Sequence, residues 1–313
     1  MGHTGMSFYG PVRRAFVLAL AMQIYRWTHG RWPDLLEPTL LTEKLFCRKF
    51  LTRMTAPIVE DKIRTPRFAV LALPVRVTVP EAVAQSKTPE FVNDLDLPAG
   101  AYFIKLNRGS GTNVKVEFPL SRDQRRALTR RLRRWLVLRE RLQIGEWWNA
   151  LIEPVYTVER AVTDDAGEQV EDWKFLVIGG RTRLVQNDLN RFRDHRQKFY
   201  DRDGNEIGIR VLRDKDTRKL PLPDTFADMV TAAEAIGSHF DLIRVDLFTK
   251  QDGTILLGEL TIVPGSGATP IQPPEADARL GKFYDLRPGK SYLADRSPLH
   301  PYFEQPESAP KRG

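Results

Sequence analysis

One stretch in the C-terminal third constrains the fold more than any other: RVDLFTKQDGTILLGELT, residues 244–261. At its centre, Asp252-Gly253 is a strong signal for a two-residue hairpin turn, because glycine adopts positive φ without steric cost. Polar and apolar residues alternate on both sides of this turn, as they do in strands with one buried face. The predicted register has four cross-strand pairs on the polar face: Lys250 with Ile255, Phe248 with Leu257, Asp246 with Glu259, and Arg244 with Thr261.

This register sets two carboxylates, Asp246 and Glu259, directly opposite each other, and like charges in that position are destabilising. Carboxylate oxygens suit Mg²⁺, which takes one or two of them and completes its coordination with water and substrate phosphates. The pair therefore predicts a metal site, to which Thr261 could add an oxygen while Arg244 neutralises a phosphate. The alternative is an exposed hairpin face on which Arg244 partly offsets the acids. On the metal-site interpretation, Asp246→Asn keeps or gains stability in the metal-free protein.

A second candidate lies in FIKLNRGSGTN, where Lys105 occupies a strand of apolar residues. An unpaired lysine in such a strand is costly, so a functional partner is expected. The loop after it carries glycines whose backbone N–H groups can converge on a phosphate, and hydroxyls that can donate to it. Its candidate phosphate-binding residues are Gly109, Ser110, Gly111 and Thr112. No Gly-Lys-Ser/Thr ends the loop, so it is not a P-loop, and an ordinary turn between strands is the alternative.

A third candidate begins at Glu159, which ends the apolar run PVYTVE. Further along, in EDWKFLVIGGR, Asp172 and Lys174 are two residues apart and share one face of a predicted strand. An acid and a base placed in this way could contact ribose hydroxyls and a phosphate, respectively. The alternative is a surface ion pair.

The chain order of these features resembles the ATP-grasp enzymes, in particular their TupA-like branch, which is linked to teichuronopeptide and other cell-surface polysaccharide synthesis. The matching parts are IKLNRGSGTN, YTVERAV, DWKFLVIGGR, and an Arg-x-Asp motif followed thirteen residues later by Glu259. Thr261 stands where the wider fold commonly has asparagine, which leaves open whether it binds a metal directly. RWPDLLEPTLLTEKLFCRKF and APIVEDKIRTPRFAV extend the resemblance upstream, so that it covers roughly residues 25–270.

The resemblance implies an ATP-grasp fold, in which two α+β subdomains hold ATP between them. It also implies a role for each candidate residue: phosphate contacts by Lys105 and Lys174, a mobile phosphate cover at residues 109–112, adenine contacts near Glu159, a ribose contact at Asp172, and Mg²⁺ at Asp246 and Glu259. Such enzymes typically activate a carboxylate as an acyl-phosphate for attack by an amine. The implied function is therefore an ATP- and Mg²⁺-dependent carboxylate–amine ligase in cell-surface polysaccharide or peptide-polymer synthesis.

In members of this kind, the charged segment 190–218 approaches the phosphate and the acceptor. Arg191 is the first candidate there and joins Arg244 as an expected catalytic residue; Arg196 and Lys198 come next. For any one of them, a solvated charged loop is the alternative. None of the five histidines has an evident partner, and structural roles are expected for His195 and His239.

Two other functions stay open. One keeps the fold but transfers the γ-phosphoryl group to a sugar or lipid-linked hydroxyl, as a kinase does. The other is a nucleic-acid-binding protein, because the net charge is +8 and the predicted helix at 122–141 is strongly basic. Nucleic acid is the less favoured partner, since an apolar stripe assigns half of this helix to a core. The stripe consists of Leu128, Leu132, Trp135, Leu136 and Leu142.

The N-terminal stretch Arg13–Trp27 has an apolar run too short to span a bilayer. A partly buried or surface-docked helix is expected there, in a cytoplasmic protein with possible peripheral membrane contact through this helix. The only cysteine, Cys47, excludes an intrachain disulfide and favours a reducing compartment.

Strands and helices mix without a strict βαβ rhythm, which predicts an α+β or mixed α/β class. Four segments are expected: a helical basic segment (1–66), the first ATP-grasp subdomain with the part before it (67–158), the second subdomain with the metal site (159–287), and an irregular tail (288–313). The local expectations are N-caps at Thr39 or Thr42, a buried strand at Phe68–Val77, a loop-rich stretch at Pro80–Gly100, strands at Ala101–Leu106 and from Val114, a helix at Ser121–Arg141, a strand pair at Trp173–Gln186, and a helix from Thr225 to Gly237.

Overall fold

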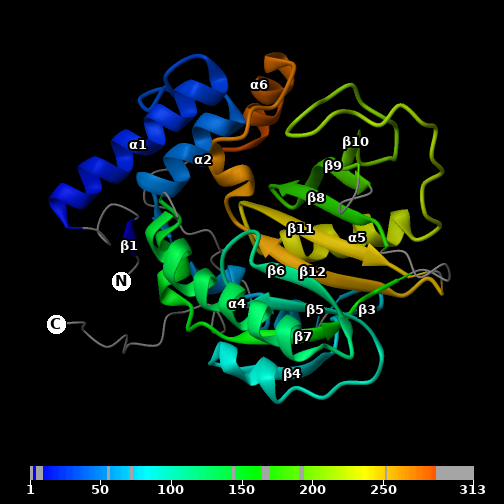
Figure 1. Cartoon of the computed structure of the whole chain (residues 1–313). Coiled ribbons are helices and arrows are strands. Elements are labelled where there is room, and N and C mark those ends of the chain that lie inside the picture. Colours follow the sequence, from blue (N-terminus) through cyan, green and yellow to red (C-terminus); the bar gives the residue numbers. More distant parts are fainter. Residues whose placement is uncertain are drawn as a thin grey trace.

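The computed structural model describes residues 3–4, 10–54, 57–70, 73–142, 145–163, 170–189, 194–250 and 252–286. Two main β-sheets face each other, each covered by a helix on its outer side, and further helices lie at one end (Figure 1). This mixture confirms the α+β class. The helices are α1 (Pro11–His29), α2 (Leu41–Phe50), α3 (Arg64–Ala69), α4 (Arg122–Leu142), α5 (Phe226–Gly237) and α6 (Pro274–Phe283). A short ribbon pairs β1 (His3–Thr4) with β2 (Arg53–Met54).

The smaller sheet has four antiparallel strands in the order β4-β7-β5-β6. They are β4 (Ala82–Ser86), β5 (Gly100–Leu106), β6 (Asn113–Phe118) and β7 (Tyr156–Arg160). One face packs against α4, where Leu128, Leu132 and Trp135 are buried with the strand residues Ile104 and Val158. The stripe from Leu128 to Leu136 is therefore core, as expected, while the predicted member Leu142 has a side chain outside the described part of the structure. Because side chains alternate along a strand, Lys105 lies on the face turned away from α4.

The larger sheet has six strands in the order β10-β9-β8-β11-β12-β3, antiparallel except where β12 meets β3. They are β3 (Val77–Thr78), β8 (Asp172–Ile178), β9 (Arg181–Leu189), β10 (Arg196–Tyr200), β11 (Leu242–Thr249) and β12 (Ile255–Thr261). Helix α5 covers one face, with Met229 and Ala233 in one buried cluster with Val177 and Val245. On β8 and β11 the residues between these apolar ones form the opposite, polar face, which turns toward the smaller sheet.

The N-terminal helices dock against the larger sheet through buried polar contacts. Arg48 of α2 donates to the Leu242 carbonyl oxygen at 3.0 Å and pairs with Asp241 at 2.9 Å, at the start of β11. Thr42 donates its backbone N–H and its hydroxyl to Asp277 of α6. These bonds hold α2 at a fixed position relative to the hairpin. Among the helices that the structure describes, none is long and apolar enough to cross a bilayer.

Several local predictions are confirmed. The helix predicted at Ser121–Arg141 is α4, and Ser121 and Gln124 form a capping box at its start, with bonds of 3.2 and 2.8 Å. Strands β5 and β6, the β8–β9 pair around Gly179-Gly180, and helix α5 all lie where the sequence places them.

Two local predictions are wrong, and a third is incomplete. Neither Thr39 nor Thr42 caps α2; the Glu43 carboxylate accepts the N–H groups of Thr39 and Leu40 instead. The predicted strand 68–77 is a helix at its start, because the Asp61 carboxylate caps α3 by accepting the N–H groups of residues 63 and 64. Pro74 lacks an N–H for a ladder, and among the described residues of this stretch strand structure begins at β3. The stretch 80–100 contains β4, whose small, half-exposed residues give a weak strand signal.

The β11–β12 hairpin confirms half of the predicted register. Asp246 pairs with Glu259 and Arg244 with Thr261, whereas Phe248 pairs with Leu256 rather than Leu257. The turn is one residue longer than expected, because Lys250 closes it with Thr254 and not with Ile255. Gly258 is then an extra, bulged residue, and the ring of Phe248 fills the space that a Cβ at 258 would need. The bulge restores the predicted pairing at the carboxylates.

Candidate functional site

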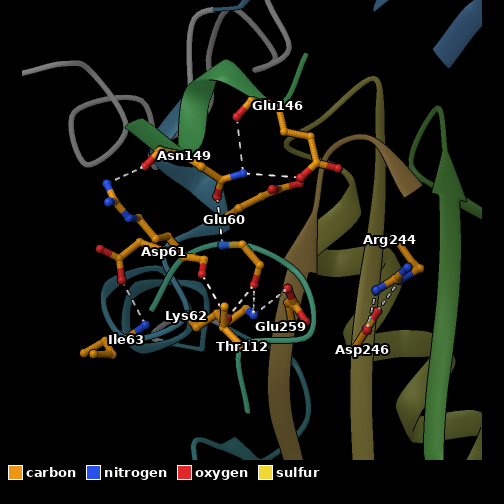
Figure 2. A network of polar contacts seen from close by, with 12 residues as sticks. Glu60, Asp61, Lys62, Ile63, Thr112, Glu146, Asn149, Arg244, Asp246 and Glu259 are labelled. Carbon is orange, nitrogen blue, oxygen red and sulfur yellow. Dashed lines mark hydrogen bonds and ion pairs between the residues drawn. The ribbon is translucent and has the colours of Figure 1, made fainter. Parts of the chain in front are cut away.

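The carboxylates of the hairpin are each held by a cation. Arg244 binds Asp246 through two parallel bonds, Nε–Oδ1 at 2.6 Å and Nη2–Oδ2 at 2.7 Å. Glu259 lies 3.6 Å from the Lys62 ammonium, which reaches it from the segment before α3 (Figure 2). Burial lowers the pKa of Arg244, but the charge of Asp246 outweighs it and raises the pKa above its ordinary value. These cations offset the like-charge repulsion across the strands.

Lys174 joins this face from the neighbouring strand β8. Its ammonium contacts the Asp172 carboxylate, lies 2.7 Å from Asp188 Oδ2, and lies 4.0 Å from Asp246 Oδ2. Burial lowers the pKa of Lys174, yet the surrounding acids outweigh it and raise the pKa. Burial raises the pKa of Asp188, while the charge and hydrogen bond of Lys174 outweigh that effect and lower it. Lys174 and Asp188 therefore stay ionised, with Lys174 as a buried cation beside the hairpin.

On the smaller sheet, Lys105 and Glu159 meet across adjacent strands. The Lys105 ammonium lies 2.5 Å from Glu159 Oε2, and both side chains are largely buried. This partner explains how a lysine is tolerated inside the apolar strand β5. Lys105 and Glu159, predicted separately, are brought together on the face opposite α4.

The Gly-rich loop between β5 and β6 is held from several sides. The Gly109 N–H donates to Asn149 Oδ1 at 2.9 Å, and its carbonyl oxygen accepts from the Lys62 ammonium at 2.6 Å. The Thr112 hydroxyl donates to the carbonyls of residues 108 and 109 within the loop. In this conformation the exposed tip consists of Ser110 and Gly111. Lys62 thus links the loop of one sheet to Glu259 of the other, as Figure 2 shows.

A small pocket opens between the two sheets. It encloses about 320 Å³ of space, part of it open to solvent, and is lined by residues of β4, β7 and β12 and of the segments around α3 and β3. Its lining includes Lys62, Gln85, Thr157, Glu159 and Leu257. Thr157 is fully buried, and its hydroxyl oxygen has no hydrogen-bond partner within the part of the chain that the structure describes. The pocket lining thus combines apolar side chains with several polar groups, as the lining of a ligand pocket does.

Sequence reasoning missed Glu60 and Glu146, which lie near Glu259 (Figure 2). Glu60 accepts hydrogen bonds from Trp148 Nε1 at 2.6 Å and from the Ile262 N–H at 2.9 Å. Burial, and then the negative charge of Glu146, raise the pKa of Glu60 to about 8. The only sequence signal was the placement of Glu60 in the stretch APIVEDKIRTPRFAV, which gives no indication of its partners.

This pKa predicts how stability depends on pH. The folded-state pKa of Glu60 lies above its ordinary value, so the folded protein binds more protons than the unfolded chain between about pH 5 and 8. Stability should therefore fall as the pH rises through this window, by at most about 1.4 kcal/mol per pH unit from this group. Urea unfolding at successive pH values measures the slope. Glu60→Gln should flatten it, and an unchanged slope in that variant would assign it to other groups.

The remaining candidates are less closely tied to the site. Arg191 lies outside the described residues. Lys198 pairs with Glu206 at 2.8 Å. Its neighbour Gln197 donates a hydrogen bond to Asp188 on the polar face. Because adjacent side chains of a strand point to opposite faces, Lys198 points away from that face. Arg196 pairs with Asp194 and lies on the same side as Lys198.

His195 lies beside the site, but its Nε2 forms no hydrogen bond among the described residues, so the expectation that it has no partner is not overturned. Its Nε2 lies 3.2 Å from Asp188 Oδ1, at the edge of the Lys174 cluster. The two residues are seven positions apart, and β10 brings them together by pairing antiparallel with β9.

These features define the ATP-grasp class of fold. They are two facing β-sheets with helices on their outer sides, a strand with Lys105 followed by a Gly-rich loop, and a hairpin that carries Arg244, Asp246 and Glu259. Within that class, the sequence pattern of the TupA-like ATP-grasp family matches residues 98–285, more than half of the chain. The chain belongs to this family.

Solved structures of other ATP-grasp proteins are similar at low identity. The ATP-grasp ligase PsnB with a minimal precursor is 17% identical over 72% of this chain and 61% of its own, with a TM-score of 0.38. D-cycloserine synthetase DcsG is 16% identical over 73% of this chain and 72% of its own, with a TM-score of 0.38. The VanG D-Ala:D-Ser ligase from Enterococcus faecalis is 18% identical over 67% of this chain and 54% of its own, with a TM-score of 0.37. The chain thus covers less than two thirds of the PsnB and VanG chains. No curated protein matches the sequence.

The residues fit a nucleotide with Mg²⁺. Asp246 and Glu259 supply two carboxylates from paired positions, the number that Mg²⁺ commonly takes from protein. The Thr261 hydroxyl, on the same face, is buried and lacks a hydrogen-bond partner among the described residues. No group of three or more His, Cys, Asp or Glu side chains able to hold a metal occurs in the described part of the chain. Coordination completed by substrate phosphates and water is the chemistry that this donor set suits.

Proposed function

We propose that the protein is an ATP- and Mg²⁺-dependent ligase that joins a carboxylate to an amine. The observation that supports this most is the cross-strand pair of Asp246 and Glu259, set beside the buried cations Arg244 and Lys174. On the smaller sheet, Lys105 pairs with Glu159 of the pocket lining, and together with the Gly-rich loop it offers a second source of phosphate-binding groups. Membership of the TupA-like ATP-grasp family supports the same function.

In this proposal ATP lies between the sheets. Glu159 and the Thr157 hydroxyl face the base in the inter-sheet pocket, and Asp172 contacts the ribose. Lys105, Lys174 and the loop tip at Ser110 and Gly111 bind phosphates. Asp246, Glu259 and Thr261 hold Mg²⁺, which supplies charge neutralisation at the phosphates when it is bound. Lys105 and Lys174 are already fixed by carboxylates, so they need little reorganisation to receive a phosphate.

The reaction then proceeds in two displacements. A substrate carboxylate oxygen attacks the γ-phosphorus of ATP, ADP leaves, and an acyl-phosphate results. The amine attacks the carbonyl carbon, phosphate leaves with the C–O bond electrons, and the amine nitrogen loses a proton as the amide forms. Arg244 and Lys174 stabilise the negative charge on the transferred phosphoryl group, since this chemistry depends mainly on positioning and charge neutralisation. Arg191 is proposed to contact phosphate and acceptor from segment 190–218.

The biological setting in this proposal is cell-surface polysaccharide or peptide-polymer synthesis in the cytoplasm, with glycan- or amino-acid-derived substrates. Family membership supports it.

Hydroxylamine trapping tests the reaction class. The purified protein is incubated with Mg-ATP, hydroxylamine and pools of amino acids and sugar acids. We expect ADP release that depends on a carboxylate and a hydroxamate product of matching mass. ADP release accompanied by a phosphorylated hydroxyl compound, without hydroxamate, would overturn the ligase proposal in favour of a kinase. Glu259→Gln is the control that should abolish either product.

A further inference from the structure

Helix α1 is apolar on two opposite faces. Its inner face is buried, with Ala21 and Tyr25 in a cluster with Phe46 and Phe50 of α2. Its outer face carries large side chains that are mostly exposed: Val12 (85%), Phe16 (66%) and Trp27 (73%). A surface helix normally shows polar residues on the face turned away from the core. The outer face of α1 therefore needs another explanation than packing within the described chain.

These exposed residues form one continuous stripe. The exposed residues Val12, Phe16, Ala19 and Trp27, with the half-buried Gln23 between the last two, follow each other at intervals of three or four residues, so they lie on one side of the helix. The stripe extends over about 22 Å at 1.5 Å per residue. Helix α1 lies along one outer edge of the molecule, with α2 between it and the larger sheet, so the stripe can meet a flat surface (Figure 1).

The same surface is cationic. Residues 1–33 contain four arginines and no aspartate or glutamate. Arg31 pairs with Glu43 at 2.5 Å, and Arg14 lies on the side of the helix opposite the stripe, so Arg13 and Arg26 are the cations that flank it. Arg13 and Arg26 are exposed at the two edges of the stripe. Arg26 stacks over the ring of Trp32 at 4.9 Å, which extends the aromatic surface beyond the helix end. The nearest acid along the chain, Asp34, accepts the N–H groups of residues 36 and 37 in the next turn.

We propose that this surface, formed by the stripe with Trp32 and the flanking arginines, docks the protein onto a bilayer that contains anionic lipids. Apolar side chains enter the headgroup region, tryptophans lie at its boundary, and arginines contact lipid phosphates. A second copy of the chain is a poorer occupant, because two such cationic surfaces repel each other. Nucleic acid would bind the arginines but would not cover Val12 and Phe16. The inference concerns localisation and does not depend on the proposed reaction.

Vesicle flotation tests the docking surface. We expect the full chain to float with vesicles of phosphatidylcholine and phosphatidylglycerol, to float weakly with phosphatidylcholine alone, and to be released by salt. The double variant Phe16→Glu/Trp27→Glu should bind the anionic vesicles roughly ten-fold or more weakly. Leu212→Glu is the matched control, because Leu212 is 64% exposed elsewhere on the surface and should not affect binding.

The exposed positions of these substitutions should leave the melting temperature nearly unchanged, which a thermal melt checks. Equal flotation of the wild type and the double variant would overturn the proposal. Failure of the folded wild type to float with either type of vesicle would also overturn it. A wild-type dimer that the double variant converts to a monomer, without any lipid binding, would assign the surface to a second copy instead.

Discussion

Asp246→Asn should abolish Mg²⁺-dependent ATP binding and also destabilise the fold, by about 2–4 kcal/mol. The aspartate neutralises Arg244 through two short bonds in a buried position, and it lies 4.0 Å from Lys174. Asparagine keeps the shape and one acceptor oxygen but removes the charge, which leaves a buried guanidinium without its counter-ion. Urea unfolding gives the stability change, and titration calorimetry of the folded variant gives the loss of binding.

A surface ion pair provides the control. Asp203 lies 3.5 Å from Arg202, and both side chains are well exposed. Asp203→Asn should change the stability by no more than about 0.5 kcal/mol, because exposed pairs contribute little. If Asp246→Asn were as stable as the wild type, the bidentate pair would not be stabilising, and the repulsion between Asp246 and Glu259 would dominate, as the sequence predicted.

Lys105→Met should lower the affinity for Mg-ATP by about 100-fold or more, since a buried, pre-oriented cation beside the pocket would be lost. The stability change should be smaller, about 1–2 kcal/mol, because Glu159 loses its partner but keeps some solvent contact. Nucleotide titration monitored by calorimetry, with thermal melts alongside, separates the two effects.

Lys115→Met is the matched control for this variant. Lys115 lies on the adjacent strand β6, is more exposed, and pairs only distantly with Glu117 at 3.6 Å. The control should bind Mg-ATP like the wild type. If both variants bound Mg-ATP as tightly as the wild type, Lys105 would not belong to the nucleotide site. If both lost affinity equally, the loss would reflect a general effect of positive charge.

The sequence located the carboxylate pair correctly, but through two errors that offset each other. The turn is one residue longer than predicted, and the bulge at Gly258 shifts the register back by one residue. Turn length depends on local backbone geometry, which Asp252-Gly253 does not determine alone. The bulge depends on the ring of Phe248 lying over Gly258. The alternation of polar and apolar residues in the sequence does not predict this contact.

Long-range partners could not be predicted in the same way. Lys62 bonds the Gly109 carbonyl and pairs with Glu259, and these three residues span nearly two hundred positions. Likewise, Glu60 meets Trp148 and Ile262 only because the sheets face each other. Such contacts follow from the assembled fold, while β5, β6, the β8–β9 pair and the apolar stripe of α4 follow from local periodicity.

The most direct test of the account is calorimetric titration of ATP into the wild type and Glu259→Gln, each with and without Mg²⁺. Glu153→Gln is the control, because Glu153 forms an exposed pair with Lys87. The account predicts that the wild type and this control bind ATP with an affinity that rises with Mg²⁺, and that Glu259→Gln loses roughly ten-fold or more of the Mg²⁺-dependent part. ATP binding by folded wild type that is indifferent to Mg²⁺, or unchanged in Glu259→Gln, would contradict the assignment of the hairpin as a metal site.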